Sequence, residues 1–196
     1  MKSIFEIFLA EHLALFERLG SLAPVVDSSV DVICESLNSK RMLFLCGNGG
    51  SAADCQHIAA ELTGRFVLDR KPLAAVALTT DSSAITAIAN DYSFDDVFSR
   101  QLIALGGEGD CLLGISTSGD SKNVVKAILA AKEIGMRTIG LTGRDGGKLA
   151  SICDHCIVVP SEITARIQEA HILIGHAICG SIEEKLGLVP QTARTR

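Results

Sequence analysis

At 196 residues, the chain is long enough to bury a sizeable core as one domain without covalent staples. Its net charge of −5 and its lack of a lysine- and arginine-rich run argue against a broad nucleic-acid surface. The N-terminus is interrupted by Glu6, Glu11 and His12, which excludes a signal peptide or a membrane span there. We therefore expect a cytoplasmic protein with no nucleic-acid and no membrane partner.

The seven cysteines also fit a reducing compartment, because most lie inside apolar segments as small hydrophobic residues. Only Cys153 and Cys156 have the spacing of metal ligands. A structural zinc site would need a second Cys/His pair nearby, and the sequence offers none. We predict that this segment leads from a loop into a strand.

Two long helices are predicted before the first strand, over residues 3–19 and 25–37. We assign them to an N-terminal helical segment (1–39) of a single domain. An α/β core (40–161) and a C-terminal helix (162–187) complete that domain.

Five apolar runs rich in β-branched residues form the core, at 42–47, 73–79, 111–117, 137–142 and 156–160. Near-continuous hydrophobicity is typical of parallel strands covered on both faces. Helical patterns separate the runs: one over 52–63 opens with Ser51 and Asp54 as a capping box, and one over 123–134 ends at Gly135. The alternation predicts an α/β fold with a doubly wound, five-stranded parallel sheet, which binds ligands at the carboxyl ends of its strands.

The last helix, predicted over 162–186, has a wide apolar face like the two N-terminal helices. A sheet of five strands cannot cover all three. Because excess apolar helix surface usually packs against another subunit, we predict a homo-oligomer that uses these helices as its interface.

Two loops of small, polar residues follow predicted strands directly. They are Cys46-Gly47-Asn48-Gly49-Gly50-Ser51 and Ser116-Thr117-Ser118-Gly119-Asp120-Ser121. Backbone N–H groups and a helix N-terminus in such a loop attract an anion. A polar N-cap is the simpler interpretation of one hydroxyl. Four hydroxyls within six residues of the second loop instead predict a phosphate site.

The first loop also fits the start of a dinucleotide-binding fingerprint. That fingerprint needs an acidic residue about 20 positions later, at the end of the second strand. Here the second strand ends near Asp81, well beyond that spacing. We therefore prefer a sugar phosphate as the ligand.

Two pairs of polar residues lie at helical spacing. His57 and Glu61 are four residues apart, and Gln168 and His176 are eight apart, so each pair shares one side of its helix. His171 lies on another side and is assigned a structural role. The first pair alone could be a surface hydrogen bond.

Two interpretations of these four residues remain open, as do two of Asn90 and Asp91. A carboxylate and an imidazole over an anchored sugar phosphate suit a proton-transfer isomerase. The same four residues suit zinc or a similar divalent ion. Asn90 and Asp91 follow the second strand and form either a plain turn or a site for sugar hydroxyls.

Several of these segments together resemble the phosphoheptose isomerases of the sugar isomerase (SIS) domain superfamily over residues 40–187. The resemblance rests on both loops, on His57-Ile58-Ala59-Ala60-Glu61-Leu62-Thr63-Gly64-Arg65, on Ala89-Asn90-Asp91, on Leu141-Thr142-Gly143-Arg144-Asp145-Gly146-Gly147, and on Arg166-Ile167-Gln168-Glu169-Ala170-His171 with His176. It implies a cytoplasmic homotetramer that converts sedoheptulose 7-phosphate to D-glycero-D-manno-heptose 7-phosphate, on the route to the heptose of lipopolysaccharide. One departure is Ala165, where some members have an aspartate.

The resemblance also implies roles for individual residues. Glu61 and His176 would be the acid/base pair. Zinc would be held by His57, Glu61, Gln168 and His176. The sugar phosphate would be bound by Asn48, Gly49, Gly50, Ser51, Glu61, Asn90, Asp91, Ser116, Thr117, Ser118, Ser121 and Gln168.

A second member of the superfamily gives the alternative function. It is a non-catalytic SIS module that binds the bacterial replication initiator, and it lacks the carboxylate and the second histidine. Because this chain has Glu61 and His176, we favour the enzyme.

Overall fold

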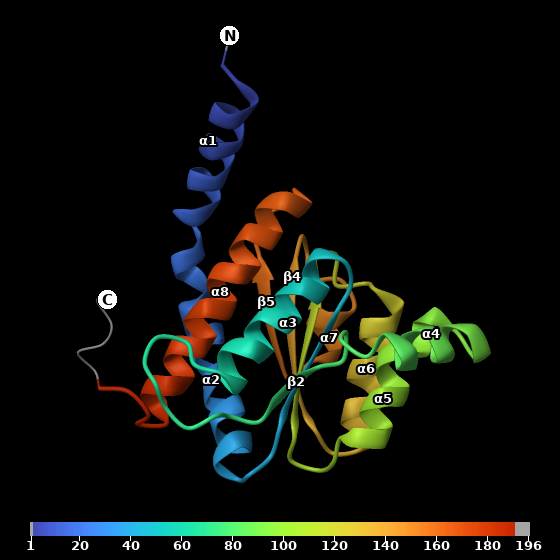
Figure 1. Cartoon of the computed structure of the whole chain (residues 1–196). Helices are drawn as coiled ribbons and strands as arrows, with labels where there is room; N and C mark the ends of the chain where they lie inside the picture. The colour runs from blue at the N-terminus through green and yellow to red at the C-terminus, as the bar shows by residue number, and fades with distance from the viewer. Residues whose placement is uncertain (1, 191–196) are drawn as a thin grey trace.

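A computed structural model describes residues 2–190 of the chain. Five parallel strands form one sheet in the order β2-β1-β3-β4-β5 (Figure 1). The strands are β1 (Leu43–Gly47), β2 (Ala75–Ala77), β3 (Cys111–Ser116), β4 (Arg137–Gly143) and β5 (His155–Val159). The predicted α/β fold and its five strands are confirmed, with the second strand shorter than expected.

Eight α-helices and two short 3-10 helices surround the sheet within the described residues. They are α1 (Ile4–Phe16), η1 (Leu19–Leu22), α2 (Ala23–Asn38), α3 (Gly50–Thr63), α4 (Ser82–Asp91), η2 (Phe94–Asp96), α5 (Val97–Leu105), α6 (Lys122–Glu133), α7 (Leu149–Ile152) and α8 (Thr164–Lys185). The sequence patterns did not single out α4, α5 or α7, which are the shortest α-helices. None of the described helices is long and apolar enough to cross a membrane.

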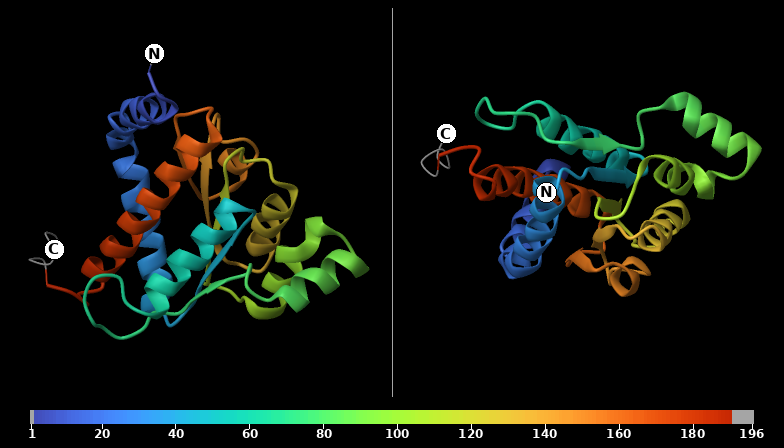
Figure 2. Two further views of the ribbon diagram at one scale, coloured as in Figure 1. Left: turned by 45° about the horizontal axis from the view of Figure 1, so that its top comes forward. Right: turned by 90° about the horizontal axis from the view of Figure 1, so that it is seen from below.

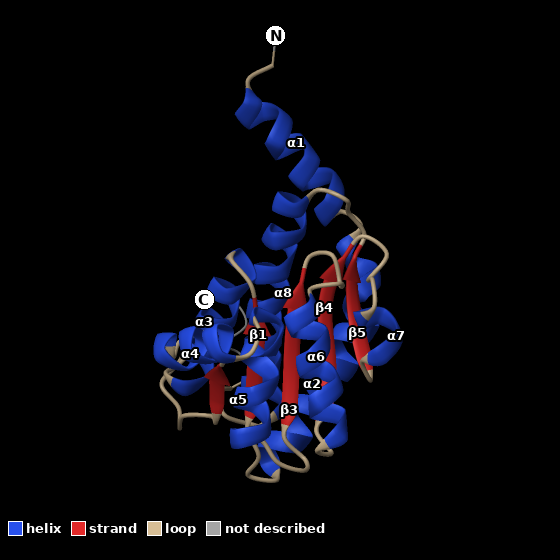
Figure 3. Ribbon diagram, turned by 90° about the vertical axis from the view of Figure 1, so that its right-hand side faces the viewer, coloured by secondary structure: helices blue, strands red, loops and turns tan. Residues whose placement is uncertain are grey.

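The core lies on both faces of the sheet, because successive side chains of a strand point to opposite sides. In β1, Leu43 and Leu45 face α2, α3 and α8, whereas Phe44 and Cys46 face α5 and α6. Figure 3 shows the strands with helices in front of them and behind them. This double coverage explains why the strands are nearly continuous apolar runs.

Helices α3 and α8 pack side by side on one face of the sheet (Figure 2). Gly175 of α8 allows the close approach, because a Cβ atom there would lie 2.7 Å from Cδ1 of Ile58 on α3. The polar residues of the two helices are thereby brought to one seam.

Helix α1 projects away from the sheet (Figure 1) and leaves much of its apolar surface exposed. Ile4 and Phe5 are 70% and 73% exposed. The helix is held by α8: the buried Arg166 donates to the Phe8 carbonyl at 2.8 Å, and His12 Nδ1 lies 2.9 Å from Glu169 Oε2. The apolar surface predicted from the sequence is therefore present on a fixed helix.

His171 is fully buried in α8, as its assigned structural role requires. Its Nε2 lies 3.0 Å from the Thr142 carbonyl, so a neutral ring donates Nε2–H there. Its Nδ1 has no hydrogen-bond partner among residues 2–190. Burial lowers the pKa of His171 from 6.5 to about 4.

Acid should therefore destabilise the protein through His171. Between pH 6.5 and 4 the unfolded chain binds a proton that the folded chain excludes, so stability is full above pH 6.5 and falls as the pH drops. The loss from this group amounts to about 3 kcal/mol. Denaturant titrations of the wild type and of His171→Gln across this range should show a steeper loss for the wild type. Parallel curves would contradict the assignment.

Candidate functional site

The first loop exposes a helix N-terminus at the carboxyl end of β1. Helix α3 begins at Gly50 with Gly49 as its N-cap, and no side chain caps it. The predicted capping box is therefore wrong: Ser51 is already inside the helix and is buried, 2.9 Å from where a Gly47 Cβ would lie. The uncapped N–H groups remain available to an anion.

The second loop gathers three hydroxyl groups at the carboxyl end of β3. Ser116 Oγ lies 2.9 Å from Ser121 Oγ and 3.5 Å from Ser118 Oγ. Ser121 occupies the N-cap position of α6, yet its side chain makes no capping bond. A simple N-cap therefore does not explain Ser121. Thr117, between these serines, is half-buried.

The glycine-rich turn after β4 packs against the second loop. Asp120 Oδ1 accepts a hydrogen bond from Lys148 N at 3.0 Å, and Gly119 O accepts one from Leu149 N at 3.1 Å. Gly119 has φ +72°, and a Cβ atom there would lie 1.9 Å from the Gly146 carbonyl oxygen. The turn after β4 therefore fixes the shape of the serine loop.

Asn48 and Asn123 join the two loops. Each side-chain amide donates to the other's carbonyl oxygen at 2.8 Å. Asn123 is buried in the first turn of α6, and the sequence analysis missed it. No local signal marks it, because its partner is 75 residues away.

The seam between α3 and α8 brings Glu61, His57 and His176 together. His57 Nε2 lies 3.1 Å from Glu61 Oε1 and 3.3 Å from His176 Nε2. One proton on His57 Nε2 satisfies both contacts, because the Glu61 carboxylate and the Nε2 lone pair of His176 can both accept it. The Phe66 ring stacks on His176 with centroids 5.6 Å apart.

Asp54 is a second polar residue whose position the sequence analysis did not predict. It lies on α3 one turn before His57, and its Oδ2 is buried without a partner. Desolvation raises the pKa of Asp54, while His57 and His176 oppose that shift. A half-buried carboxyl therefore extends the polar seam toward the first loop.

Gln168 lies at the first loop. A Cβ atom on Gly50 would be 2.4 Å from Gln168 Nε2, so glycine makes room for the amide. His57 is seven residues further along α3, about 10 Å by the rise of a helix. The structure thus places Gln168 beside the helix N-terminus and the two histidines deeper in the seam.

The seam contains side chains of the types that bind zinc. The described residues nevertheless include no group of three or more His, Cys, Asp and Glu side chains arranged as a metal site. The contacts run pairwise through His57. When two nitrogen ligands each lie about 2.0 to 2.1 Å from a tetrahedral zinc ion, the two nitrogens are about 3.3 Å apart. The Nε2 atoms of His57 and His176 are 3.3 Å apart, which matches this ligand-to-ligand distance.

Asn90 and Asp91 lie away from the seam between α3 and α8. They end α4, and Asn90 Nδ2 donates to Asp91 Oδ1 at 2.8 Å on the exposed surface. In Figures 1 and 2, α4 lies on the opposite side of the molecule from α8. They are therefore part of a helix, not the plain turn considered above.

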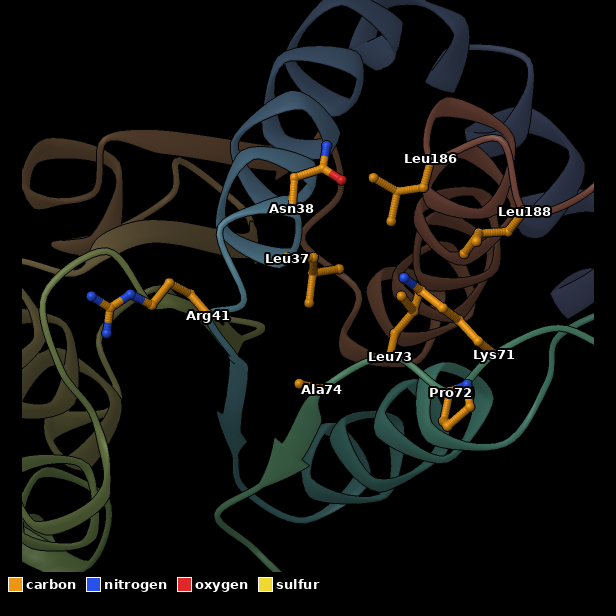
Figure 4. Close-up of a pocket in the computed structure, with 9 residues that line it drawn as sticks. All are labelled: Leu37, Asn38, Arg41, Lys71, Pro72, Leu73, Ala74, Leu186 and Leu188. Atoms are coloured by element: carbon orange, nitrogen blue, oxygen red, sulfur yellow. The ribbon is translucent and has the colours of Figure 1, made fainter.

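Two of the cavities lie at opposite ends of strands β1 and β2. One of about 150 Å³ borders the first loop and is lined by Gly47, Asn48, Gly49, Ala52, Thr79, Ile85, Phe94, Val97 and Phe98. The other, of about 200 Å³, lies beside the start of β2, between the end of α2 and the residues after α8, with leucines on its walls (Figure 4). The first therefore lies at the carboxyl end of β1, beside the first loop.

Comparison with known proteins places these features in one group. The SIS domain family model matches residues 8–143. The phosphoheptose isomerase of Helicobacter pylori (strain P12) is 54% identical over 176 residues, which are 90% of this chain and 92% of that protein.

Two solved structures are similar over nearly their whole length. The phosphoheptose isomerase of Neisseria gonorrhoeae is 48% identical with a TM-score of 0.87, covering 92% of this chain and 97% of the other. That of Francisella tularensis is 37% identical with a TM-score of 0.89, covering 94% and 100%.

Proposed function

We propose that this chain, which belongs to the phosphoheptose isomerase family of SIS-domain proteins, converts sedoheptulose 7-phosphate to D-glycero-D-manno-heptose 7-phosphate. The chain is a sugar-phosphate isomerase. The observation that carries the assignment is the joining of Glu61 and His176, through His57, at the seam beside two phosphate-type loops.

The loops hold the substrate in this proposal. The hydroxyls of Ser116, Ser118 and Ser121, with the N-terminus of α6, receive the phosphate. Their clustering within 3.5 Å supports this role. Sugar hydroxyls are assigned to the remaining predicted residues, Asn48, Gly49, Gly50, Ser51, Asn90, Asp91, Thr117 and Gln168. Because α4 lies far from α8, Asn90 and Asp91 would act in a site of another subunit.

Glu61 and His176 carry the proton transfers. The Glu61 carboxylate removes a proton from C1 of the ketose, which gives an enediolate, and returns it to C2. His176 donates a proton to the oxygen at C2 and accepts the one from the hydroxyl at C1. The exchange is assigned to His176 Nε2, the ring nitrogen that faces His57 in the seam.

Zinc is part of the proposal, held by His57, Glu61, His176 and Gln168. A bound ion supplies a Lewis acid that polarises the carbonyl. The N···N separation in the seam supports two of the ligands. Gln168 would reach the ion from its place beside Gly50, at the start of α3.

Purified protein is therefore expected to contain about one zinc ion per chain, which a strong chelator removes together with most of the activity. A His57→Ala variant should lose the metal, because it loses the ligand between the other two. Elemental analysis of both proteins measures this, with His12→Gln on α1 as the control. Full activity in metal-free protein would contradict the role of zinc.

A homotetramer in the cytoplasm completes the proposal. The exposed apolar residues of α1 support an interface. All seven cysteines are free, as is usual in a reducing compartment. The non-catalytic module that binds a replication initiator is not favoured, because nothing in a purely binding role accounts for Glu61 contacting His57, which in turn contacts His176.

The assay that tests this function is conversion of sedoheptulose 7-phosphate by purified protein, followed by NMR. The expected result is the aldose 7-phosphate at equilibrium with the ketose. Absence of turnover with and without added zinc would overturn the assignment.

A further inference from the structure

The segment between α3 and β2 is held by one buried ion pair. Arg70 Nε donates to Glu183 Oε1 at 2.7 Å, and the two side chains are only 2% and 1% exposed. Glu183 lies near the end of α8, which this segment passes in Figure 1. Burying two charges is costly unless additional hydrogen bonds satisfy them. Here one of those bonds goes to the neighbouring Lys71 carbonyl, and the others reach residues around Glu61 and His176.

Arg70 caps the C-terminal end of α3. Its Nη2 donates to the Glu61 carbonyl at 2.7 Å, and its Nη1 donates to the carbonyls of Leu62 at 2.7 Å and Gly64 at 2.9 Å. Because α3 ends at Thr63, the carbonyls of its last turn have few helical partners. A cation also favours the negative end of the helix dipole. The guanidinium thus fixes the backbone of the residue that carries the proposed base.

Glu183 fixes the other side of the seam. The same Oε1 accepts a hydrogen bond from Phe66 N at 3.1 Å, and the Phe66 ring stacks on His176. Glu183 follows His176 by seven residues, so both lie on one side of α8. The pair therefore links the backbone under Glu61 to the ring that packs on His176.

We propose that Arg70 and Glu183 are positioning residues for the isomerisation, and that their ion pair fixes the position of the Glu61 carboxyl relative to the His176 imidazole. This role rests on the proposed function. Neither residue touches the reacting atoms. A displacement of about 1 Å at the acid/base pair lowers turnover about a hundredfold.

Two variants test the role. Arg70→Lys keeps the charge but loses the planar fork that reaches four carbonyls, those of Glu61, Leu62, Gly64 and Lys71. The double variant Arg70→Met, Glu183→Met replaces the pair by apolar side chains of similar length, a change that buried pairs often tolerate without loss of stability. Both should lower kcat about a hundredfold. KM should change little, because the serine loop lies outside these contacts.

The control is Lys185→Met, which removes an exposed ion pair between the same helix and Asp31. It should leave kcat unchanged. Thermal melting and circular dichroism measure folding, so that kcat refers to folded protein. A double variant that folds and keeps wild-type kcat would show that the pair only stabilises the fold, as would an Arg70→Lys variant with a lower melting temperature and normal kcat. Wild-type protein without turnover would instead overturn the proposed function itself.

Discussion

A Glu61→Gln variant is expected to lose turnover of sedoheptulose 7-phosphate by about a thousandfold, the scale of general acid–base catalysis. Glutamine keeps the shape of the side chain and can still accept a hydrogen bond from His57, but it cannot take the proton from C1. The contact of 3.1 Å between Glu61 and His57 should therefore survive the change. The loss should appear in kcat, with KM nearly unchanged.

Steady-state kinetics on matched preparations measure this effect. Glu133→Gln, at the exposed end of α6, removes the same charge away from the seam and should leave kcat unchanged. Near wild-type turnover by Glu61→Gln would show that another group is the base. Asp54 would then be the first candidate, because its carboxyl lies one turn before His57 and has a raised pKa.

A Gly119→Ala variant is expected to bind the sugar phosphate much more weakly. The new Cβ atom would lie 1.9 Å from the Gly146 carbonyl oxygen, in a backbone with φ +72° that disfavours alanine. The serine loop or the turn after β4 must move to relieve the clash. Strain of this kind costs about 3 kcal/mol, which corresponds to a rise in KM of about a hundredfold if it falls on phosphate binding.

Gly187→Ala is the matched control, since Gly187 has φ +66° and open space around it. It should show the small stability cost of the backbone alone, with KM unchanged. The measurement is KM with melting temperature for both variants. A normal KM for Gly119→Ala would contradict the role of this loop as the phosphate site.

The sheet and both loops were predictable because their signals are local. A buried parallel strand is a continuous apolar run, and each loop follows its strand directly. The start of α3 was predicted wrongly, because the sequence of Ser51 and Asp54 imitates a capping box while Gly49 takes the N-cap. Helices α4 and α5 are short, so their periodicity is weak.

The contacts of the site could not be predicted by the same means. His57 and His176 are 119 residues apart, and Arg70 and Glu183 are 113 apart, so their meeting depends on how α3 packs on α8. Asn123 was missed for the same reason. Asn90 and Asp91 follow the second strand in the sequence, so they were expected near the carboxyl ends of the strands. Helix α4 instead runs outward and separates them from the other site residues.

Solvent-deuterium exchange tests the central claim, that Glu61 moves a proton between C1 and C2. In D2O the wild-type protein should place deuterium at C2 of the heptose 7-phosphate and at C1 of the remaining sedoheptulose 7-phosphate, and Glu61→Gln should do neither. A Glu61→Gln variant that exchanges at the wild-type rate would contradict the account, whereas aldose that carries no deuterium would mean that the carboxyl returned the C1 proton to C2 before it exchanged with solvent.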